Sequence, residues 1–154
     1  DENEDTRSEI SLLLVALAIS KYKPNNVPNN LPTLLFDKFQ KRLSIEKNDS
    51  VKVSFINGIA NLEMDKTKKI ALLKYYLGED TEVLKITAAY HLVHQELNEE
   101  AIEILNDALY YSDKTDLLFA DSTWFQMDMS FYILRVLCSL PLDYFNQIWK
   151  YIIR

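Results

Sequence analysis

The chain has 154 residues, of which 48% are hydrophobic and 26% are charged, and these proportions are ordinary for a soluble globular domain. With only two glycines, the composition favours helices over sheets with tight hairpins, because such hairpins need glycine at left-handed turn positions. The longest strongly apolar run, 10–19, is shorter than the ~20 residues that a helix needs to cross a bilayer, so we expect no membrane span.

The net charge of −6 is distributed unevenly along the chain. Residues 1–20 carry a net charge of −4, residues 21–74 carry +6 and residues 75–154 carry −8. Nucleic-acid-binding domains cluster Lys and Arg and are usually basic overall. The total charge therefore makes a nucleic-acid partner unlikely, although the basic middle segment keeps it open as an alternative.

The chain reads as a succession of helices. An acidic tail, 1–7, precedes a single helical-repeat domain at 8–154. The first helix ends near Tyr22, and the segment 23–30, with two prolines and four asparagines, interrupts the helical pattern. Seven further helices are expected at about 32–43, 49–62, 65–78, 80–97, 98–111, 122–140 and 142–153.

Small polar residues mark several of these helix starts. Asp49 or Ser50 is expected to cap the third helix, Asp80 or Thr81 the fifth, and Asn98 opens the sixth. The connection between the sixth and seventh helices is longer than the others and rich in acidic residues.

Residues 49–112 contain the same pattern twice, with a spacing of 32 or 33 residues. Self-similarity at such a period is typical of stacked helical repeats. The matched pairs are Asp49/Glu82, Val51/Leu84, Lys52/Lys85, Phe55/Ala88 and Ile59/Leu92 in the first helix of each copy, and Ile70/Ile102, Leu73/Leu105 and Leu77/Leu109 in the second.

The doubled pattern resembles HEAT repeats, whose first helix often follows an Asp and carries an aliphatic–basic pair, with a small residue four positions after the aliphatic residue and Leu eight positions after it. Here Asp80 precedes Leu84–Lys85, with Ala88 and Leu92 at those positions. Both copies have Lys where the family favours Arg. The resemblance implies an all-α, right-handed superhelix of about four antiparallel HEAT-like hairpins, or about eight helices, whose second helices line a concave face.

The outward positions of the two copies differ in charge. If the matched apolar residues point inward, the second helix of the first copy presents lysines, while that of the second copy presents carboxylates. Aromatic and charged residues are frequent at protein interfaces. The residues expected to contact a partner are Lys41, Lys68, Lys74, Tyr75, Glu103, Asn106, Asp107, Tyr110, Asp121 and Trp124.

These residues indicate a non-enzymatic protein–protein interaction module that uses its concave face and its C-terminal acidic and aromatic loop. One form is an inhibitor of the immunity type, whose acidic surface covers a basic toxin. The alternatives are a nucleic-acid-binding or DNA-glycosylase-like HEAT protein, or a fragment of a larger scaffold solenoid. We expect a monomer or a part of a larger assembly.

No residue pattern predicts catalysis, a cofactor or a metal. His91 and His94 are three positions apart on one helix, but no further His or suitable Cys completes a tetrahedral site. The acidic residues near 107–128 lack the spacing of a calcium loop and read as a solvated rim. The single cysteine, Cys138, lies in an apolar segment and is expected to be buried and inert.

One unpaired cysteine fits a reducing compartment, so we expect a cytoplasmic location. The first residue is Asp1, which predicts a processed or truncated form.

Overall fold

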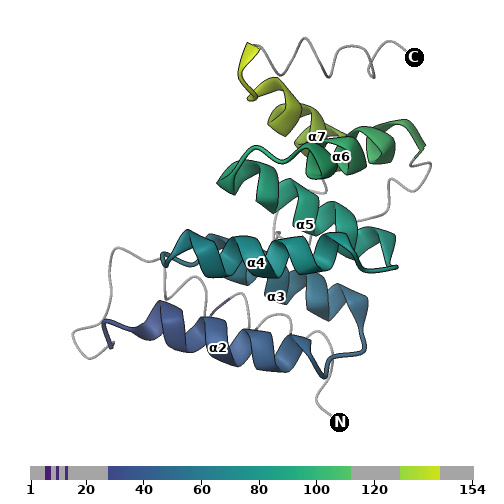
Figure 1. The fold of residues 1–154 in the computed structure, drawn as a ribbon. Coiled ribbons are helices and arrows are strands. Elements are labelled where there is room, and N and C mark those ends of the chain that lie inside the picture. The colour runs from purple at the N-terminus through teal and green to yellow at the C-terminus, as the bar shows by residue number, and fades with distance from the viewer. Residues whose placement is uncertain (1–5, 8–9, 11–12, 14–27, 112–128, 143–154) are drawn as a thin grey trace. The chain divides into compact units, whose positions relative to one another are not determined.

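A computed structural model of the chain describes residues 6–7, 10, 13, 28–111 and 129–142 (Figure 1). This part of the chain is helical and contains no strand, which confirms the all-α class. No helix in it combines the length and the apolar character that crossing a bilayer requires. Its labelled helices are α2 (Leu31–Leu43), α3 (Asp49–Asn61), α4 (Lys66–Leu77), α5 (Glu82–Gln95), α6 (Glu99–Tyr111) and α7 (Met129–Cys138).

These helices lie where five of the expected helices were placed, and α7 lies within a sixth. The acidic connection before α7 falls outside the described residues, as do most of the expected first helix and, apart from Leu142, the expected last helix. Thr6 and Arg7 are helical, so the helix at the N-terminus includes the end of the segment expected as a tail. The chain divides within α4 into two compact units, 1–72 and 73–154.

In the first unit, α2 packs against α3. Pro32 lies in the first turn of α2, where the missing N–H has no intrahelical acceptor to lose. The apolar residues of α2 recur at helical spacing, and the expected Phe36, Phe39 and Leu43 are all buried. The rings of Phe39 and Phe55 meet with their centroids 5.2 Å apart, which joins the two helices through an aromatic contact.

Helix α3 is buried on nearly all sides. Its Val51, Ile56 and Ile59 are at most 1% exposed, and even its polar Ser54 is fully buried. The Ser54 hydroxyl donates a hydrogen bond to the backbone oxygen of Ser50 at 3.2 Å, so this buried donor is satisfied within the helix. A helix that is apolar all round belongs to the centre of a packed unit.

In the second unit, α5 packs against both α6 and α7, and α6 also packs against α7. The residues of α5 that face this core, Leu84, Ala88 and Leu92, are fully buried. Thr87 is fully buried too, and its hydroxyl donates to the backbone oxygen of Val83 at 2.7 Å. Helix α5 therefore forms the centre of the second unit.

The two copies of the repeat match in burial in their first helices and only partly in their second. In the first helix of each copy, the apolar positions are at most 6% exposed and the paired lysines are partly exposed. In the second helices, Leu73 and Leu105 are both fully buried, but the other two pairs differ, since Ile70 and Leu109 are partly exposed where Ile102 and Leu77 are buried. The repeat therefore marks the core positions of α3 and α5 and one shared core position of α4 and α6.

Of the three expected helix caps, one differs by one position and two lie at expected residues. The side chain of Asn48, rather than Asp49 or Ser50, accepts a hydrogen bond from the Val51 N–H at 3.0 Å and caps α3. Thr81 occupies the N-cap position of α5 but makes no side-chain cap bond. Asn98 is confirmed at the start of α6, where its Oδ1 accepts from the Ala101 N–H at 2.9 Å.

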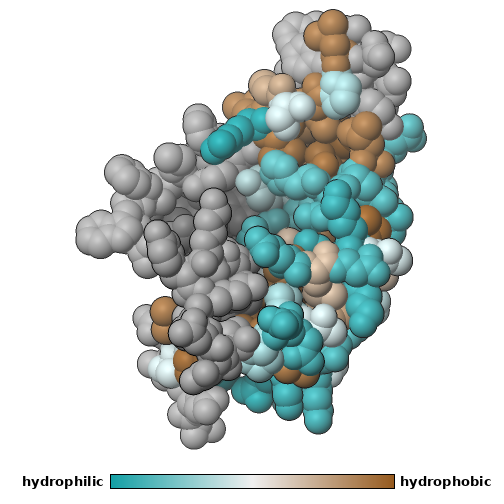
Figure 2. All heavy atoms as spheres, turned by 90° about the vertical axis from the view of Figure 1, so that its left-hand side faces the viewer, coloured by the Kyte–Doolittle hydropathy of each residue, from teal (hydrophilic) through white to brown (hydrophobic). Residues whose placement is uncertain are grey.

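The prediction that Cys138 is buried is wrong, because this residue is exposed. Among the described side chains of α7, Ile133, Val136 and Leu137 are buried. Cys138 follows the exposed Leu134 by four positions, so it lies on the same exposed side of the helix as Leu134. Figure 2 shows hydrophobic surface gathered over this part of the second unit.

Candidate functional site

The outer face of α4 carries exposed charged and aromatic side chains around a small residue. Helical spacing places Thr67, Lys68, Lys74 and Tyr75 three or four positions from Ala71, so all four surround its methyl group. All five are exposed, and the opposite side of the helix is buried. We call this set the outer face of α4. It carries no carboxylate.

All three expected contact residues on this face have neighbours in the structure. The Lys68 ammonium lies 6.0 Å from the ring centroid of Phe36, at the outer limit of a cation–π contact. The Lys74 ammonium forms an ion pair with Glu96 at 2.7 Å. Tyr75 is 65% exposed, and its ring meets that of the buried Tyr76 edge-on at 5.2 Å. A large aromatic side chain is thus exposed on the helix that also carries these two cations.

The outer face of α6 has the opposite charge. Glu99, Glu100, Glu103 and Asp107 are all exposed, and their spacing of three or four positions places them along one side of the helix. Helix α6 contains no basic residue. We call these four residues the acidic face of α6. The expected residues Glu103 and Asp107 are therefore exposed together.

Asn106, which the sequence analysis expects to face outward, is buried at 3% exposure. Asn106 follows the buried Ile102 by four positions, so the two side chains lie on the same side of α6, and Asn106 lies at the edge of the core. Among the described residues, its Oδ1 atom has no hydrogen-bond partner. Asn106 is thus corrected from a contact residue to a core residue.

The other expected contact residues are not gathered into one site by the described structure. Lys41 is exposed on α2, in the first unit. Asp121 and Trp124 lie outside the described residues, and so does the side chain of Tyr110. The structure brings together Lys68, Lys74 and Tyr75 on one helix, and Glu103 with Asp107 on another.

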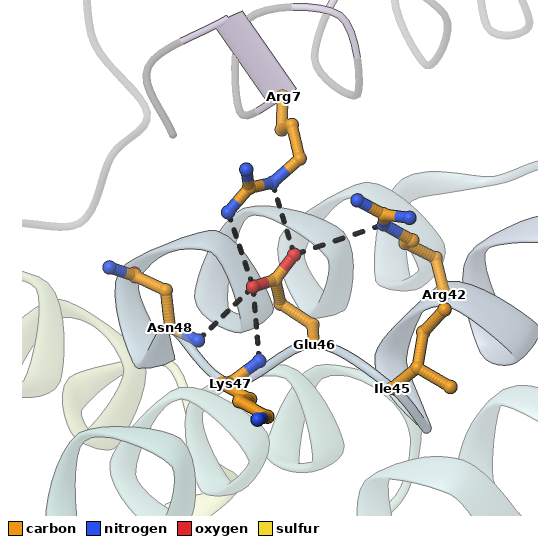
Figure 3. Close-up of a pocket in the computed structure, with 6 residues that line it drawn as sticks. All are labelled: Arg7, Arg42, Ile45, Glu46, Lys47 and Asn48. Atoms are coloured by element: carbon orange, nitrogen blue, oxygen red, sulfur yellow. Dashed lines mark hydrogen bonds and ion pairs between the residues drawn. The ribbon is translucent and has the colours of Figure 1, made fainter. Parts of the chain in front are cut away.

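The loop between α2 and α3 forms a charged cluster that the sequence analysis did not anticipate. The guanidinium of Arg7 forms two hydrogen bonds with the Glu46 carboxylate, from Nε to Oε2 at 3.2 Å and from Nη2 to Oε1 at 3.3 Å. Oε1 also accepts from the backbone N–H groups of Lys47 and Asn48 at 3.0 and 3.1 Å. Figure 3 shows the guanidinium groups of Arg7 and Arg42 converging on this carboxylate.

The environment of Glu46 stabilises its charged form. Its side chain is 6% exposed, and burial by itself raises the pKa of this carboxyl. The two backbone N–H groups and Arg7 outweigh burial, so the pKa of Glu46 lies below its usual range. The cluster surrounds an open depression of about 300 Å³. Its lining residues, which define what we call the Arg42 depression, are Arg7, Arg42, Ile45, Glu46, Lys47 and Asn48.

A second unanticipated feature is the buried Lys69, which is 6% exposed. Its ammonium donates to the backbone oxygens of Ala60 and Leu62, at 3.2 and 2.9 Å. These carbonyls lie at the C-terminal end of α3, where a cation is favourable. Burial, with a smaller contribution from the nearby Lys66, lowers the pKa of Lys69.

The described residues include no group of three His, Cys, Asp or Glu side chains placed to hold a metal ion. The rings of His91 and His94 both meet the ring of Tyr90 edge-on, at 5.1 and 5.0 Å. Burial, and then the charge of Arg135, lowers the pKa of His94. The two histidines therefore contact the ring of Tyr90 on the same helix, α5.

Sequence signals for these unanticipated features are weak. Arg42 and Glu46 are four positions apart, a spacing that indicates only an ordinary surface pair. Arg7 and Glu46 are 39 positions apart, and no periodicity links them.

No protein-family model, curated protein or solved structure matches this chain.

Proposed function

We propose that this chain is a non-enzymatic module that binds a protein partner through the outer faces of α4 and α6. The observation that carries the proposal is the outer face of α4, the helix on which Tyr75 is 65% exposed and Lys68 and Lys74 are exposed as well. Tyrosine provides a large contact area at low conformational cost and is enriched among the residues that dominate binding energy. The acidic face of α6 supplies a second surface of opposite charge.

The proposed scaffold is a HEAT-like solenoid, a right-handed superhelix of about four hairpins. Its support is the matching burial of the first helices of the two repeat copies, together with the equivalent core positions of Leu73 and Leu105 in the second helices. In such scaffolds function resides in side chains outside the core, because stacking uses the apolar ones. In this chain, those side chains are the ones on the outer faces of α4 and α6.

The partner proposed for the acidic face is a basic protein, as for an inhibitor of the immunity type. The four exposed carboxylates of this face have no basic residue on the same helix, and the whole chain carries a net charge of −6. Complementary charge mainly accelerates association and selects the partner. Binding should therefore weaken as salt rises, since the Debye length falls from about 10 Å at 0.1 M to about 3 Å at 1 M.

Affinity capture with the chain as bait tests this function. The double variant Glu103→Lys/Asp107→Lys, and separately Tyr75→Ala, should each reduce recovery of a specific partner by about tenfold or more, the effect of about 1.4 kcal/mol. The matched control is Asp37→Lys/Glu63→Lys, which changes the net charge equally at exposed residues outside both faces. Unchanged recovery with both test variants would exclude the two faces as the binding surface.

A nucleic-acid partner is the second candidate, and the lysines of α4 are the observation that favours it. Lys66, Lys68 and Lys74 are exposed together with Tyr75, on which a base can stack. Lys74 already pairs with Glu96, which reduces the charge available to phosphate. A mobility shift at low salt that disappears at high salt would support this candidate, and no shift at low salt would remove it.

A further inference from the structure

Two helices of the described structure present apolar side chains to solvent along one side. In the N-terminal helix, Ile10 is 48% and Leu13 is 64% exposed, and their spacing of three positions places them on the same side. On α7, Leu134 is 41% exposed, and Cys138, four positions later, is exposed as well. We call the first pair the N-terminal face and the second pair the α7 face.

The α7 face is separate from the side that packs within the second unit. Ile133, Val136 and Leu137 are buried where α7 packs against α5 and α6. Arg135 is the only charged residue of this helix. Figure 2 shows the hydrophobic surface that gathers over this part of the unit. A helix that is apolar on more than one side is typical of the interior of a packed structure rather than of its surface.

Stacked repeats give a reason for such faces. In the proposed HEAT-like scaffold each hairpin covers the apolar side of the one before it, and a terminal unit needs a polar outer side because no hairpin covers it. The N-terminal helix and the last labelled helix, α7, both lack a fully polar outer side. The two faces therefore have the character of hairpin surfaces that a further hairpin covers.

The charges near the two faces are complementary. Residues 1–20 contain five acidic residues and one basic residue, a net charge of −4. Arg135 is exposed three positions before Cys138, at the edge of the α7 face, and no carboxylate of the described residues forms an ion pair with it. Burial, and then the charge of Arg135, lowers the pKa of the neighbouring His94, so Arg135 is the cation at this edge.

We propose that a second copy of this chain covers these faces, with the N-terminal face of one copy packed on the α7 face of the next. The contact repeats between copies the stacking of hairpins within one copy, so the inference rests on the scaffold of the proposed function. It uses no side chain from the outer faces of α4 and α6. Failure of the affinity capture would therefore leave it standing, and its own failure would leave those faces available to another partner.

Sedimentation of the full chain at increasing concentration tests the contact. Because the two surfaces differ, each added copy leaves one face free, and the average mass should rise beyond that of a dimer. The measurement covers about 1 μM to about 1 mM, the range expected of weak interfaces. A mass that stays at that of one chain throughout this range would overturn the proposal.

Mixing two variants tests the direction of the contact. Ile10→Asp/Leu13→Asp and Leu134→Asp/Cys138→Asp each spoil one face, so each variant alone should associate about tenfold or more weakly than wild type, because the contact would bury unpaired carboxylates. Each variant keeps the face that the other lacks. An equal mixture should therefore form a dimer that does not grow further. Association of either variant alone at the wild-type level would rule out this pairing of faces.

The matched control is Leu34→Asp/Ile45→Asp, which adds the same two charges at exposed apolar residues outside both faces. This variant should associate as wild type does. Equal weakening by the control and by the two test variants would show that the added charge alone opposes association, and the assignment to the two faces would then be wrong.

Alkylation of Cys138 by iodoacetamide gives a measurement on the unsubstituted chain. Cys138 is the only cysteine, so the reaction reports this position alone. In wild type its rate constant should fall about twofold or more once half of the chains are associated. In Ile10→Asp/Leu13→Asp it should stay constant as concentration rises. A wild-type rate constant that does not change while the mass increases would show that association leaves the α7 face uncovered, and would overturn the proposal.

Discussion

At the scale of single residues, Lys69 joins two helices by hydrogen bonds rather than by apolar packing. Its ammonium donates to the carbonyls of Ala60 and Leu62 at the end of α3, and it reaches them from α4. Leaving buried carbonyls without donors costs about 1–3 kcal/mol. We therefore expect Lys69→Met to lower the free energy of unfolding by about that amount in a urea titration at pH 7.

The control for Lys69 is Lys66→Met, an exposed position on the same helix, which should change the free energy of unfolding by less than about 0.5 kcal/mol. The pH dependence gives a second readout. The folded-state pKa of Lys69 is below 10.5. Between that folded-state pKa and 10.5 the unfolded chain binds more protons than the folded chain, so Lys69 makes the free energy of unfolding rise with pH. Lys69→Met should lack this rise.

Tyr76 affects stability in the opposite direction, because its ionisation makes the free energy of unfolding fall as the pH rises above 10. Burial, followed by the charge of Glu79, raises its pKa to about 12, so its contribution to stability is lost above pH 10. Because Tyr76 is present in both proteins, the difference between wild type and Lys69→Met isolates the lysine. A difference that stays constant as the pH rises to 10.5 would contradict the assignment of the shift to Lys69.

At the scale of helices, the caps provide a direct test of local structure. Asn48 and Asn98 each accept a backbone hydrogen bond from the first turn of a helix, whereas Thr81 occupies the same position without such a bond. Replacing a bonded cap with alanine costs about 1 kcal/mol. Asn48→Ala and Asn98→Ala should each lose about that much, and Thr81→Ala less than about 0.5 kcal/mol, by denaturant midpoint. Equal losses at all three positions would contradict the cap geometry.

The helices and their buried sides could be predicted from the sequence because both depend on short-range periodicity. Leu73 and Leu105 were matched as repeats, and both are fully buried. Periodicity failed where a residue lies near the edge of the buried side. Asn106 is polar and therefore read as exposed, yet it lies over the core, while Cys138 is apolar in context and faces away from it.

The charged cluster of the first unit could not be predicted for a different reason. The fork between Arg7 and Glu46 depends on where a loop places two side chains that are 39 positions apart. A single sequence contains no signal for such a pair. Lys69 shows a related difficulty, because a lysine is expected at the surface although this one precedes the buried Leu73 by four positions and lies on the buried side of α4.

At the scale of the whole molecule, the boundary between the two compact units falls inside a continuous helix. Residues of α4 up to Leu72 belong to the first unit, and residues from Leu73 belong to the second. Both leucines are buried. Helix formation is cooperative, so loss of one end of α4 weakens the other. We therefore expect the wild-type chain to unfold in a single transition.

Ala71→Pro should separate this transition into two. Proline inside a helix removes a backbone hydrogen bond, clashes with the preceding turn and costs about 3 kcal/mol. Ala71 is exposed, so the substitution breaks α4 next to the boundary without removing core volume. Both tryptophans, at positions 124 and 149, lie in the sequence range of the second unit, so their fluorescence follows that part of the chain, while far-UV circular dichroism reports helices throughout the chain.

In wild type the two signals should have the same urea midpoint, and in Ala71→Pro the midpoints should differ, since each unit then unfolds with its own stability. Ala71→Ser is the matched control. It lowers helix propensity by about 0.5 kcal/mol without breaking the backbone hydrogen bond, so both signals should shift together. Coincident midpoints in Ala71→Pro would show that the coupling between the units does not depend on an unbroken α4.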